Sequence, residues 1–202
     1  MSISGKVGAI FMQTADAAVV FTDAPMTDSG DHAIYYITDG VKRYWDKETA
    51  VTVEVDGTPV TNFTVQYPGG RIVLDTPLTG VEVVTASGKY LTLAEVGGFY
   101  SWNLDMESDM ADITTFASNG WKENEPTIKG FKASAEAFWQ DDVLSDNLGI
   151  ELALVFYVDD VNLYRYECFG KISGDSIGAK FSEIISEKIE IQGNGQLYYR
   201  AG

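Results

Sequence analysis

Apolar and polar residues alternate with a period of two along much of the chain, which is typical of strands with one buried face. In "AVTVEVDGTPV", Val51, Val53 and Val55 fall on one face. The Asp56-Gly57 pair that follows favours a type I′ turn, because that turn needs positive φ at both central positions. We therefore expect a β-hairpin at this point.

Three other stretches predict paired strands. "FTVQYPGGRIVLDTP" contains a Pro-Gly-Gly turn and a return strand over Arg71–Leu74. "GVEVVTASGKYLTL" predicts another pair around Ser87-Gly88, so we expect residues 34–95 to form a meander of short strands. Further along, "ELALVFYVDDVNLYRYECFGKISG" predicts one long hairpin with its turn at residues 159–162.

Helical periodicity is confined to "DDVLSDNLGIEL", which begins with two possible capping residues, Asp141 and Asp142. The run "DMESDMADITTF" fits either a turn or a helical loop. The last strand, "SEKIEIQGNGQLYYR", carries Gly193 and Gly195, which mark a bulge or bend. Together these patterns predict a mainly β fold, a β-barrel or sandwich of antiparallel strands with one short flanking α-helix.

The length of 202 residues is close to that of a single domain. No linker, low-complexity segment or internal repeat divides the chain. We therefore predict one domain over residues 1–202. Gly97-Gly98 is the one candidate seam, and it separates the 34–95 meander from residues 98–202.

The chain is strongly acidic, with 14 Lys and Arg against 30 Asp and Glu and a net charge of −16. This charge disfavours tight binding of nucleic acid and of anionic membrane surfaces. The N-terminal apolar run is broken by Gln13 and Asp16, and no apolar run approaches the length of a membrane helix. We expect neither a signal peptide nor a membrane span, and a chain that stays soluble in the cytoplasm where it is made.

No constellation of catalytic, cofactor-binding or metal-ligating residues emerges from the sequence. Cys168 and His32 are the sole residues of their types, so neither a disulfide nor a zinc site has enough partners. The acidic run from Asp105 to Asp112 could hold calcium, but it lacks the glycine and closing Glu of an EF-hand loop. Paired carboxylates for glycoside hydrolysis stay open, because thirty acids guarantee accidental pairs. We predict that the chain is not an enzyme and uses no cofactor or metal.

The segment "DITTFASNGWKENEPTIKGFKASAEAFW" (residues 112–139) resembles a recurring stretch of the major tail tube proteins of long-tailed (siphovirus-type) bacteriophages. In that family, a similar Asp-Thr-Thr-Phe run leads through Glu and Pro into a strand of alternating small residues that ends in aromatics. "EKIEIQGNGQLYYRAG" (187–202) is similar to the last strand of the family. "YYITDGVKRYWDKETAVTVEVDG" (35–57) is similar to a segment found ahead of the core, and residues 98–202 match that core best.

The resemblance implies a structural virion protein that assembles into hexameric rings. The rings stack into the tail tube, and the genomic DNA passes through the lumen without tight binding during ejection. The implied partners are sibling copies and other tail proteins: the tape measure, distal tail and tail terminator proteins. The implied location is the virion tail, after synthesis in the cytoplasm of a bacterial host. An acidic lumen would repel DNA from the wall, whereas the alternative role of the charge is solubility before assembly.

The polar segment "DITTFASNGW" is our candidate subunit or ring contact. Its polar side chains can bond to backbone groups, its glycine permits a sharp turn, and Trp121 can anchor a buried contact. The alternative is a loop that folds onto its own barrel, with Trp121 filling its own core. The predicted contact residues are Asp112, Thr114, Thr115, Phe116, Ser118, Gly120 and Trp121.

Two other functions stay open. A distal tail or tail-completion ring protein with the same fold would stop at one ring instead of polymerising. A carbohydrate-binding β-sandwich module would bind sugars through exposed aromatic side chains, although strand cores already account for most aromatics.

Overall fold

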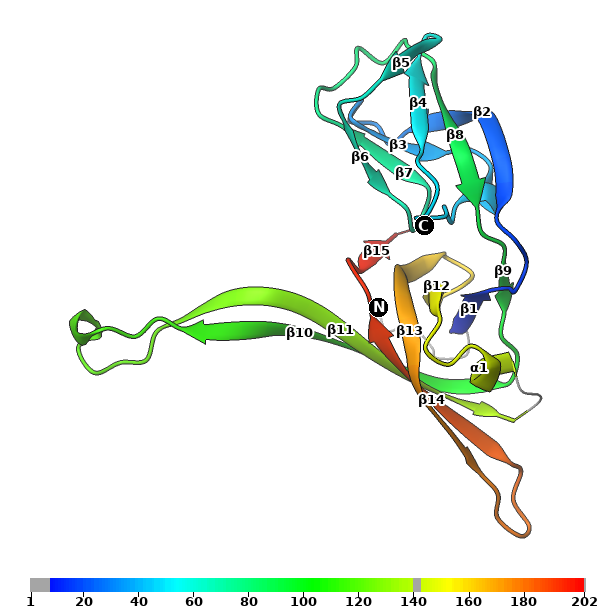
Figure 1. Cartoon of the computed structure of the whole chain (residues 1–202), viewed down its shortest axis with the longest axis vertical. Coiled ribbons are helices and arrows are strands. Elements are labelled where there is room, and N and C mark those ends of the chain that lie inside the picture. The colour runs from blue at the N-terminus through cyan, green and yellow to red at the C-terminus, as the bar shows by residue number, and fades with distance from the viewer. Residues whose placement is uncertain (1–7, 140–142, 202) are drawn as a thin grey trace. The chain divides into compact units, whose positions relative to one another are not determined.

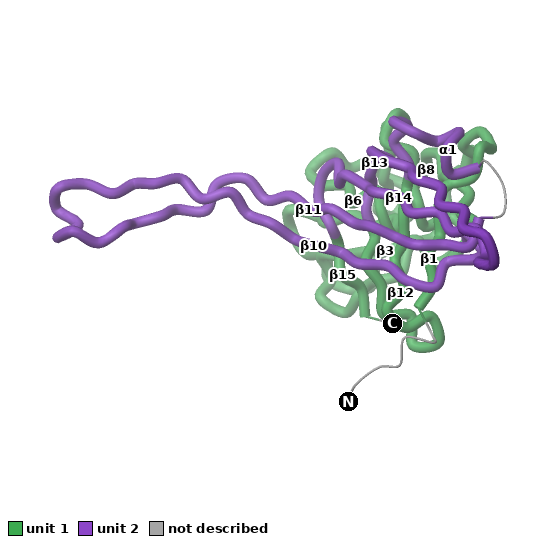
Figure 2. The backbone as a smooth tube through the Cα atoms, turned by 90° about the horizontal axis from the view of Figure 1, so that it is seen from below, with its two compact units in different colours: residues 1–95, 153–167, 198–202 green, residues 96–152, 168–197 purple. Residues whose placement is uncertain are grey.

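The computed structural model describes residues 8–139 and 143–201, which divide into two compact units. Unit 1 comprises residues 1–95, 153–167 and 198–202, and unit 2 comprises residues 96–152 and 168–197 (Figure 2). The division falls between residues 95 and 96, close to the predicted Gly97-Gly98 seam. The expectation of a single domain over 1–202 stays a prediction.

Most of unit 1 is built from short strands (Figure 1). Its strands are β1 (Ala9–Gln13), β2 (Val19–Asp28), β3 (Ile34–Ile37), β4 (Thr52–Val55), β5 (Thr58–Val60), β6 (Phe63–Gln66), β7 (Arg71–Leu74), β8 (Val84–Tyr90), β9 (Leu93–Glu95) and β15 (Tyr198–Arg200). Two longer strands, β12 (Glu151–Asp159) and β13 (Tyr164–Gly178), contribute residues to both units.

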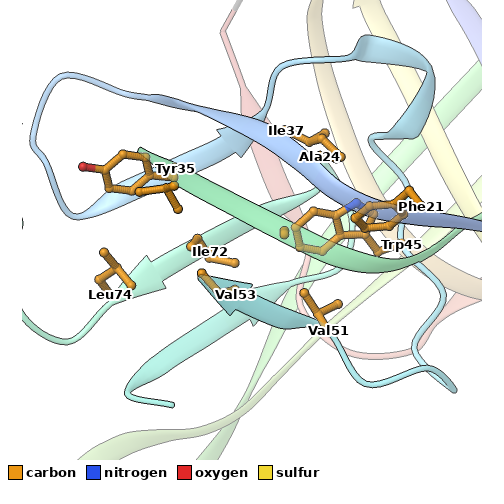
Figure 3. Close-up of a cluster of buried hydrophobic side chains, with 11 residues drawn as sticks. Phe21, Ala24, Tyr35, Ile37, Trp45, Val51, Val53, Ile72 and Leu74 are labelled. Atoms are coloured by element: carbon orange, nitrogen blue, oxygen red, sulfur yellow. The ribbon is translucent and has the colours of Figure 1, made fainter. Parts of the chain in front are cut away.

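Seven of these strands form one antiparallel sheet in the order β5-β4-β8-β2-β3-β7-β6, which curls around an apolar core (Figure 1). The core side chains come from every part of this sheet, and Figure 3 shows them pointing toward one another. Phe21 and Trp45 stack with their ring centroids 5.6 Å apart. Trp45 and Ile37 are completely buried, and this cluster is the hydrophobic core of the seven-stranded sheet.

The seven-stranded sheet is inserted between two strands that pair with each other. β1 pairs with β12 on one side and with β9 on the other, and both pairings are antiparallel. The chain leaves this ladder at Thr14 and returns at Thr92, and the Thr14 amide donates to the Thr92 carbonyl at 2.8 Å. Residues 19–90 therefore form an insertion whose two ends are held side by side.

A buried ion cluster lies between the inserted sheet and the strands β13 and β15 of unit 1. The Glu167 carboxylate, which has no exposed surface, accepts from Arg165 Nε at 2.7 Å and from Arg200 Nε at 3.2 Å. Arg200 also donates to Gln66 Oε1 at 2.8 Å. The backbone of Gly69 packs directly on the carboxylate, so a Cβ there would overlap it.

The two remaining arginines lie in the electrostatic reach of the same cluster. Burial and the neighbouring Arg200 lower the pKa of Arg71, and the charge of Arg43 also acts on it. All four arginines of the chain therefore gather around one carboxylate. Burial and the charge of Glu167 also raise the pKa of the Tyr44 hydroxyl.

Unit 2 consists mainly of long strands in a second antiparallel ladder. Its ladder runs β10 (Phe99–Asp112), β11 (Asn124–Phe138), β14 (Ser186–Gly193) and the later part of β13. Small side chains at Ala133, Ala135 and Ala137 alternate with polar ones along β11 and are buried. The short helix α1 (Val143–Asp146) buries Leu144 in this unit.

The predicted fold class is confirmed: the chain is mainly β, its sheets are antiparallel, and one short α-helix is present in the described residues. Asp56 and Gly57 both have positive φ between β4 and β5, as the turn prediction required. The hairpin of β6 and β7 is also confirmed. The proposed caps of α1 at Asp141 and Asp142 lie outside the described residues.

Two strand predictions are wrong. Ser87 and Gly88 do not form a turn, because β8 runs straight through them and pairs with β2 and β4. Gly88 instead lets the ring of Phe21 approach the backbone, so its role is close packing. The meander is wrong as well, since β8 lies between β4 and β2 in the sheet. The ambiguous run "DMESDMADITTF" is mostly strand β10.

Nowhere in the described residues is a helix long and apolar enough to span a membrane. Cys168, the one cysteine of the sequence, is buried. His32 lies in a loop and contacts the carboxylate of Asp28 through Nδ1.

The Glu167 cluster generates a stability prediction. Replacing Glu167 with Gln removes the counter-charge of the buried Arg165 and the partly buried Arg200, so we expect the free energy of unfolding to fall by about 3–5 kcal/mol. Denaturant unfolding measures this change. Glu183→Gln is the control, because its ion pair with Lys180 at 3.2 Å is exposed and worth about 1 kcal/mol or less. Equal effects of the two substitutions would contradict the prediction.

Candidate assembly interface

The hairpin of β10 and β11 continues beyond the rest of the unit 2 ladder. β14 pairs with β11 only from Lys132 to Phe138, whereas β10 and β11 pair with each other out to Asp112 and Asn124. Residues 106–131, which we call the arm, therefore form a two-stranded ribbon (Figure 2). Among the described residues no third strand pairs with the arm.

Both strands of the arm carry apolar side chains that are exposed to solvent. Met106, Met110 and Ile128 are each more than half exposed. A two-stranded ribbon has little stability of its own in water, and large apolar side chains on its surface are a mark of an interaction site. The arm therefore has the composition of a segment that is covered in an assembly.

The tip of the arm, residues 113–123, is held together by hydrogen bonds between its two sides. The Ile113 amide donates to the Glu123 carbonyl at 3.0 Å, and the Glu123 amide donates to Thr114 Oγ1 at 2.9 Å. Hydrogen bonds from Thr114 hold the pKa of the Asp112 carboxyl below its ordinary value, and Lys122 acts in the same direction. These interactions stabilise the folded tip at pH values above the ordinary pKa of Asp. The stabilisation is lost as the pH falls through the lowered pKa of Asp112.

A single 3₁₀ turn over Phe116–Ser118 shapes the end of the tip. Thr115 and Ser118 form a capping box, in which the hydroxyl of each residue accepts a hydrogen bond from the backbone N–H of the other. Ser118 is followed by a left-handed Asn119 and by Gly120 at φ 81°, a backbone that a residue with a Cβ rarely adopts. The Trp121 amide then donates to the Ser118 carbonyl at 2.9 Å.

The side chains of six of the seven predicted contact residues fall into two groups, and the seventh residue, Gly120, shapes the turn. The polar side chains fold the tip onto itself, and Ser118 is only 7% exposed. The two aromatic side chains face solvent: Trp121 is 78% exposed and Phe116 is completely exposed. Trp121 therefore does not fill the core of its own chain. That the loop contacts a neighbouring copy stays a proposal.

A groove of about 700 Å³ lies at the base of the arm, and we call it the base groove. Met106 and Ser108 of β10 line one side, and Phe131 of β11 forms part of the floor. The connection after β14 supplies the other side, including Gly193 and Leu197. The ring of Phe131 packs against the backbone of Gly193, where a Cβ would overlap it.

Charges are distributed unevenly between the tip and the base groove. At the tip, Asp112 pairs with Lys122 at 3.6 Å, which leaves the nearby Glu123 and Glu125 without an ion pair in the described residues. At the groove, Lys132 pairs with Glu107 at 3.0 Å. Lys129 lines the groove and makes no ion pair with any described residue. The tip thus carries two carboxylates without an ion pair, and the groove carries one lysine without an ion pair, because the charge of its Glu107 is balanced by Lys132.

The acidic run that was considered as a calcium site lies within strand β10. Asp105, Glu107 and Asp109 occupy alternate positions of an extended strand, so their carboxylates are spread along it instead of converging. Within residues 8–139 and 143–201, no group of three or more His, Cys, Asp or Glu side chains is arranged to hold a metal ion.

A second exposed apolar end belongs to the connection between β13 and β14. Phe181 and Ile184 lie there, and both are largely exposed. The two charged residues of this connection, Lys180 and Glu183, pair with each other at 3.2 Å. This end is therefore apolar and locally neutral.

Neither the arm itself nor the base groove was predicted from the sequence. The signal for the arm was present in the alternation of "DMESDMAD", in which Met106 and Met110 are separated by acids. Because of its many acidic residues, this run was predicted to be a turn or a helical loop instead of a strand. The groove is lined by residues about 60 positions apart along the chain, such as Phe131 and Gly193, and no local sequence pattern predicts their contact.

No family model and no curated protein matches the chain. Solved structures are similar to part of it, and these include the following two. A chain from "Tail of empty GTA particle computed with helical refinement, C6 symmetry" is 13% identical with a TM-score of 0.46, over 55% of this chain and 87% of that chain. A chain from "Virion of native gene transfer agent (GTA) particle" is 12% identical with a TM-score of 0.43, over 54% and 89%. At this level of similarity, neither comparison assigns a function.

The packing of the base groove yields a prediction. Gly193→Ala places a methyl group in the ring of Phe131, so we expect the free energy of unfolding to fall by roughly 1–3 kcal/mol, as for other overpacked sites. Gly130→Ala is the matched control on the same groove, because a Cβ there meets its nearest atom, Glu107 Cγ, at 3.8 Å. Thermal or denaturant unfolding compares the two variants. A Gly193→Ala protein as stable as the control would refute the packing argument.

Proposed function

We propose that this chain is a structural subunit of a phage-type tail tube, which self-assembles into stacked hexameric rings and conducts DNA through its lumen. The segment that resembles tail tube proteins, residues 112–139, contains the tip and one strand of the arm. The resembling segment therefore includes three of the exposed apolar residues of the arm, Phe116, Trp121 and Ile128. Tape measure, distal tail and tail terminator proteins are the further partners that this proposal entails.

The observation that carries the proposal is the exposure of Phe116 and Trp121 at the end of an uncovered ribbon. An aromatic side chain of this kind buries about 150–250 Å² in a contact, which at about 25 cal/mol per Å² is a gross gain of roughly 4–6 kcal/mol. Aromatic residues in such positions dominate the affinity of protein interfaces. A monomer gains nothing from this arrangement, whereas a polymer does.

The outer edge of β10 offers a second means of association. β10 is the terminal strand of its ladder, and within the described residues no strand pairs with its outer edge. An edge that no strand covers can extend a sheet from one copy into the next. The acidic side chains along β10 disfavour pairing with arbitrary strands, which is how exposed edges are protected before the correct partner arrives.

Whether copies of the chain form a closed ring depends on the symmetry of the contact between them. A contact between two different surfaces of one chain is heterologous, and it generates a ring if its rotation closes. Stacking of rings then needs complementary upper and lower faces. A distal tail or tail-completion protein would form one ring and stop, so the length of the assembled particles separates the two roles. We propose no enzymatic activity and no sugar binding.

The tip generates the test of this proposal. Phe116→Ala and Trp121→Ala each remove an exposed aromatic side chain, so we expect the folded monomer to keep its stability within about 0.5 kcal/mol. Assembly should weaken strongly, because loss of one dominant interface residue costs about 2 kcal/mol, or roughly a 30-fold higher critical concentration. Sedimentation and negative-stain microscopy of purified protein at increasing concentration measure this.

Val81→Ala is the matched control, because Val81 is an exposed apolar residue of unit 1 outside the arm. It should leave the critical concentration unchanged. Normal assembly of Trp121→Ala combined with a less stable monomer would contradict the proposal and return the tip to a role in its own fold.

The acidic charge generates a separate prediction for the assembled tube. Six copies of a chain with a net charge of −16 form each ring, and we expect the lumen wall to be net negative, so that DNA is repelled from it. A cryo-microscopy map of the tube identifies the residues of the wall. A net positive wall would contradict this role and leave the charge as a device for keeping the unassembled chain soluble.

A further inference from the structure

We infer that the base groove of one copy receives the arm tip of a second copy of this chain. This inference rests on the proposed function and adds to it the site on which the tip docks. The groove offers an apolar surface from Met106, Phe131 and Leu197, and the tip offers the exposed rings of Phe116 and Trp121. Its volume of about 700 Å³ accommodates aromatic side chains of this size.

The charges of the two surfaces are complementary. Lys129 on the groove makes no ion pair with any described residue, and neither do Glu123 and Glu125 beside the tip. A tip seated in the groove brings the free carboxylates toward the free ammonium group. Complementary charges of this kind steer association and set its register.

A polar atom in the groove also lacks a partner. The Ser108 hydroxyl oxygen is buried and makes no hydrogen bond with any described residue. Ser108 lines the groove, so an incoming segment can satisfy its hydroxyl. The Trp121 indole N–H is a donor that needs an acceptor once its ring is buried.

The same chain cannot make this contact. The groove lies beside the Met106–Phe131 pair of the ladder, and the tip begins six residues further along β10, after Asp112. At about 3.3 Å per residue the two are roughly 20 Å apart along a paired ribbon. The contact is therefore between different surfaces of two copies, which is the type that propagates into rings or stacks.

The apolar connection between β13 and β14 is the competing occupant. It also carries an exposed aromatic residue, Phe181, but its Lys180 and Glu183 neutralise each other. It therefore offers no net charge to the unpaired Lys129. The arm tip satisfies both the apolar and the charged features of the groove.

Cross-linking between copies tests the inference. Ala117 is small, exposed and adjacent to Phe116, so Ala117→Cys introduces a thiol at the tip and keeps both aromatic residues. Gln196→Cys introduces a thiol at the groove. Mixed assemblies of the two variants are oxidised mildly and analysed by denaturing electrophoresis without reductant. Since a disulfide needs Cα atoms within about 7 Å, a covalent dimer of the two variants is expected only when the tip occupies the groove.

Three controls accompany this experiment. Each variant assembled alone should give at least tenfold less dimer than the mixture, and the native Cys168 is buried. Phe181→Cys, mixed with Gln196→Cys, tests the competing occupant. Thr61→Cys, an exposed position of unit 1, replaces the tip thiol in a negative control.

The outcomes separate the two proposals. Assembly with the Ala117–Gln196 dimer supports the inference. Assembly in which Phe181→Cys gives the dimer instead, or in which no tip dimer forms, overturns the inference and leaves the tail tube proposal standing. Absence of any assembly by the unmodified chain overturns the proposed function and the inference with it.

Charge reversal gives an independent readout. Lys129→Glu should raise the critical concentration for assembly roughly three- to tenfold, because it places like charges together. Adding Glu123→Lys and Glu125→Lys to the same chain should restore it, whereas these two changes alone should weaken assembly. Lys171→Glu, an exposed lysine of β13, is the control for net charge. An equal effect of Lys171→Glu, or no rescue, would contradict the docking of the tip at Lys129.

Discussion

The backbone hydrogen bonds of the arm are the constraint on which the rest depends. The two strands of the arm pair only with each other, in the ladder of β10 and β11, while the rest of unit 2 is built on several ladders. An isolated ribbon with exposed Met, Ile, Phe and Trp side chains is a costly element for a monomer. It becomes favourable when a second surface covers it, and for this reason we propose the arm as the contact through which the chain assembles.

The Glu167 cluster addresses a different problem, which is how an inserted sheet is held in place. Residues 19–90 are inserted between Thr14 and Thr92, and the backbone hydrogen bond between these two residues holds the ends of the insertion together. The cluster adds buried contacts from Gln66 and Gly69 to β13 and β15, and its directional bonds restrict the geometry more than apolar packing would. Because it gathers all four arginines, the positive charge that remains elsewhere comes only from lysines. The rest of the chain is correspondingly more acidic than the average composition suggests.

Sequence patterns predicted the local elements well where turn chemistry was specific. The Asp56-Gly57 hairpin is confirmed because two positive φ angles in succession have few other uses. The Ser87-Gly88 turn is wrong because a glycine also serves close packing, here against Phe21, and the sequence does not distinguish the two uses. Strand β10 was missed because its acids obscured the alternation of a ribbon that is exposed on both faces. The candidate tip was found through its resemblance to a known family, although the roles of its residues were not separated.

The amino-acid sequence by itself determined the class of the fold, the Asp56-Gly57 turn and the acidic charge, and it indicated the segment that we propose as an interaction site. These properties depend on neighbouring residues and on composition, which a sequence displays directly. Only the tertiary structure decided that Thr115 and Ser118 fold the tip while Phe116 and Trp121 face outward. It also decided that Glu167 meets Arg200 and that Phe131 meets Gly193. Those pairs are separated by 33 and 62 positions, and their meeting depends on how strands are ordered in a sheet, which no local pattern encodes.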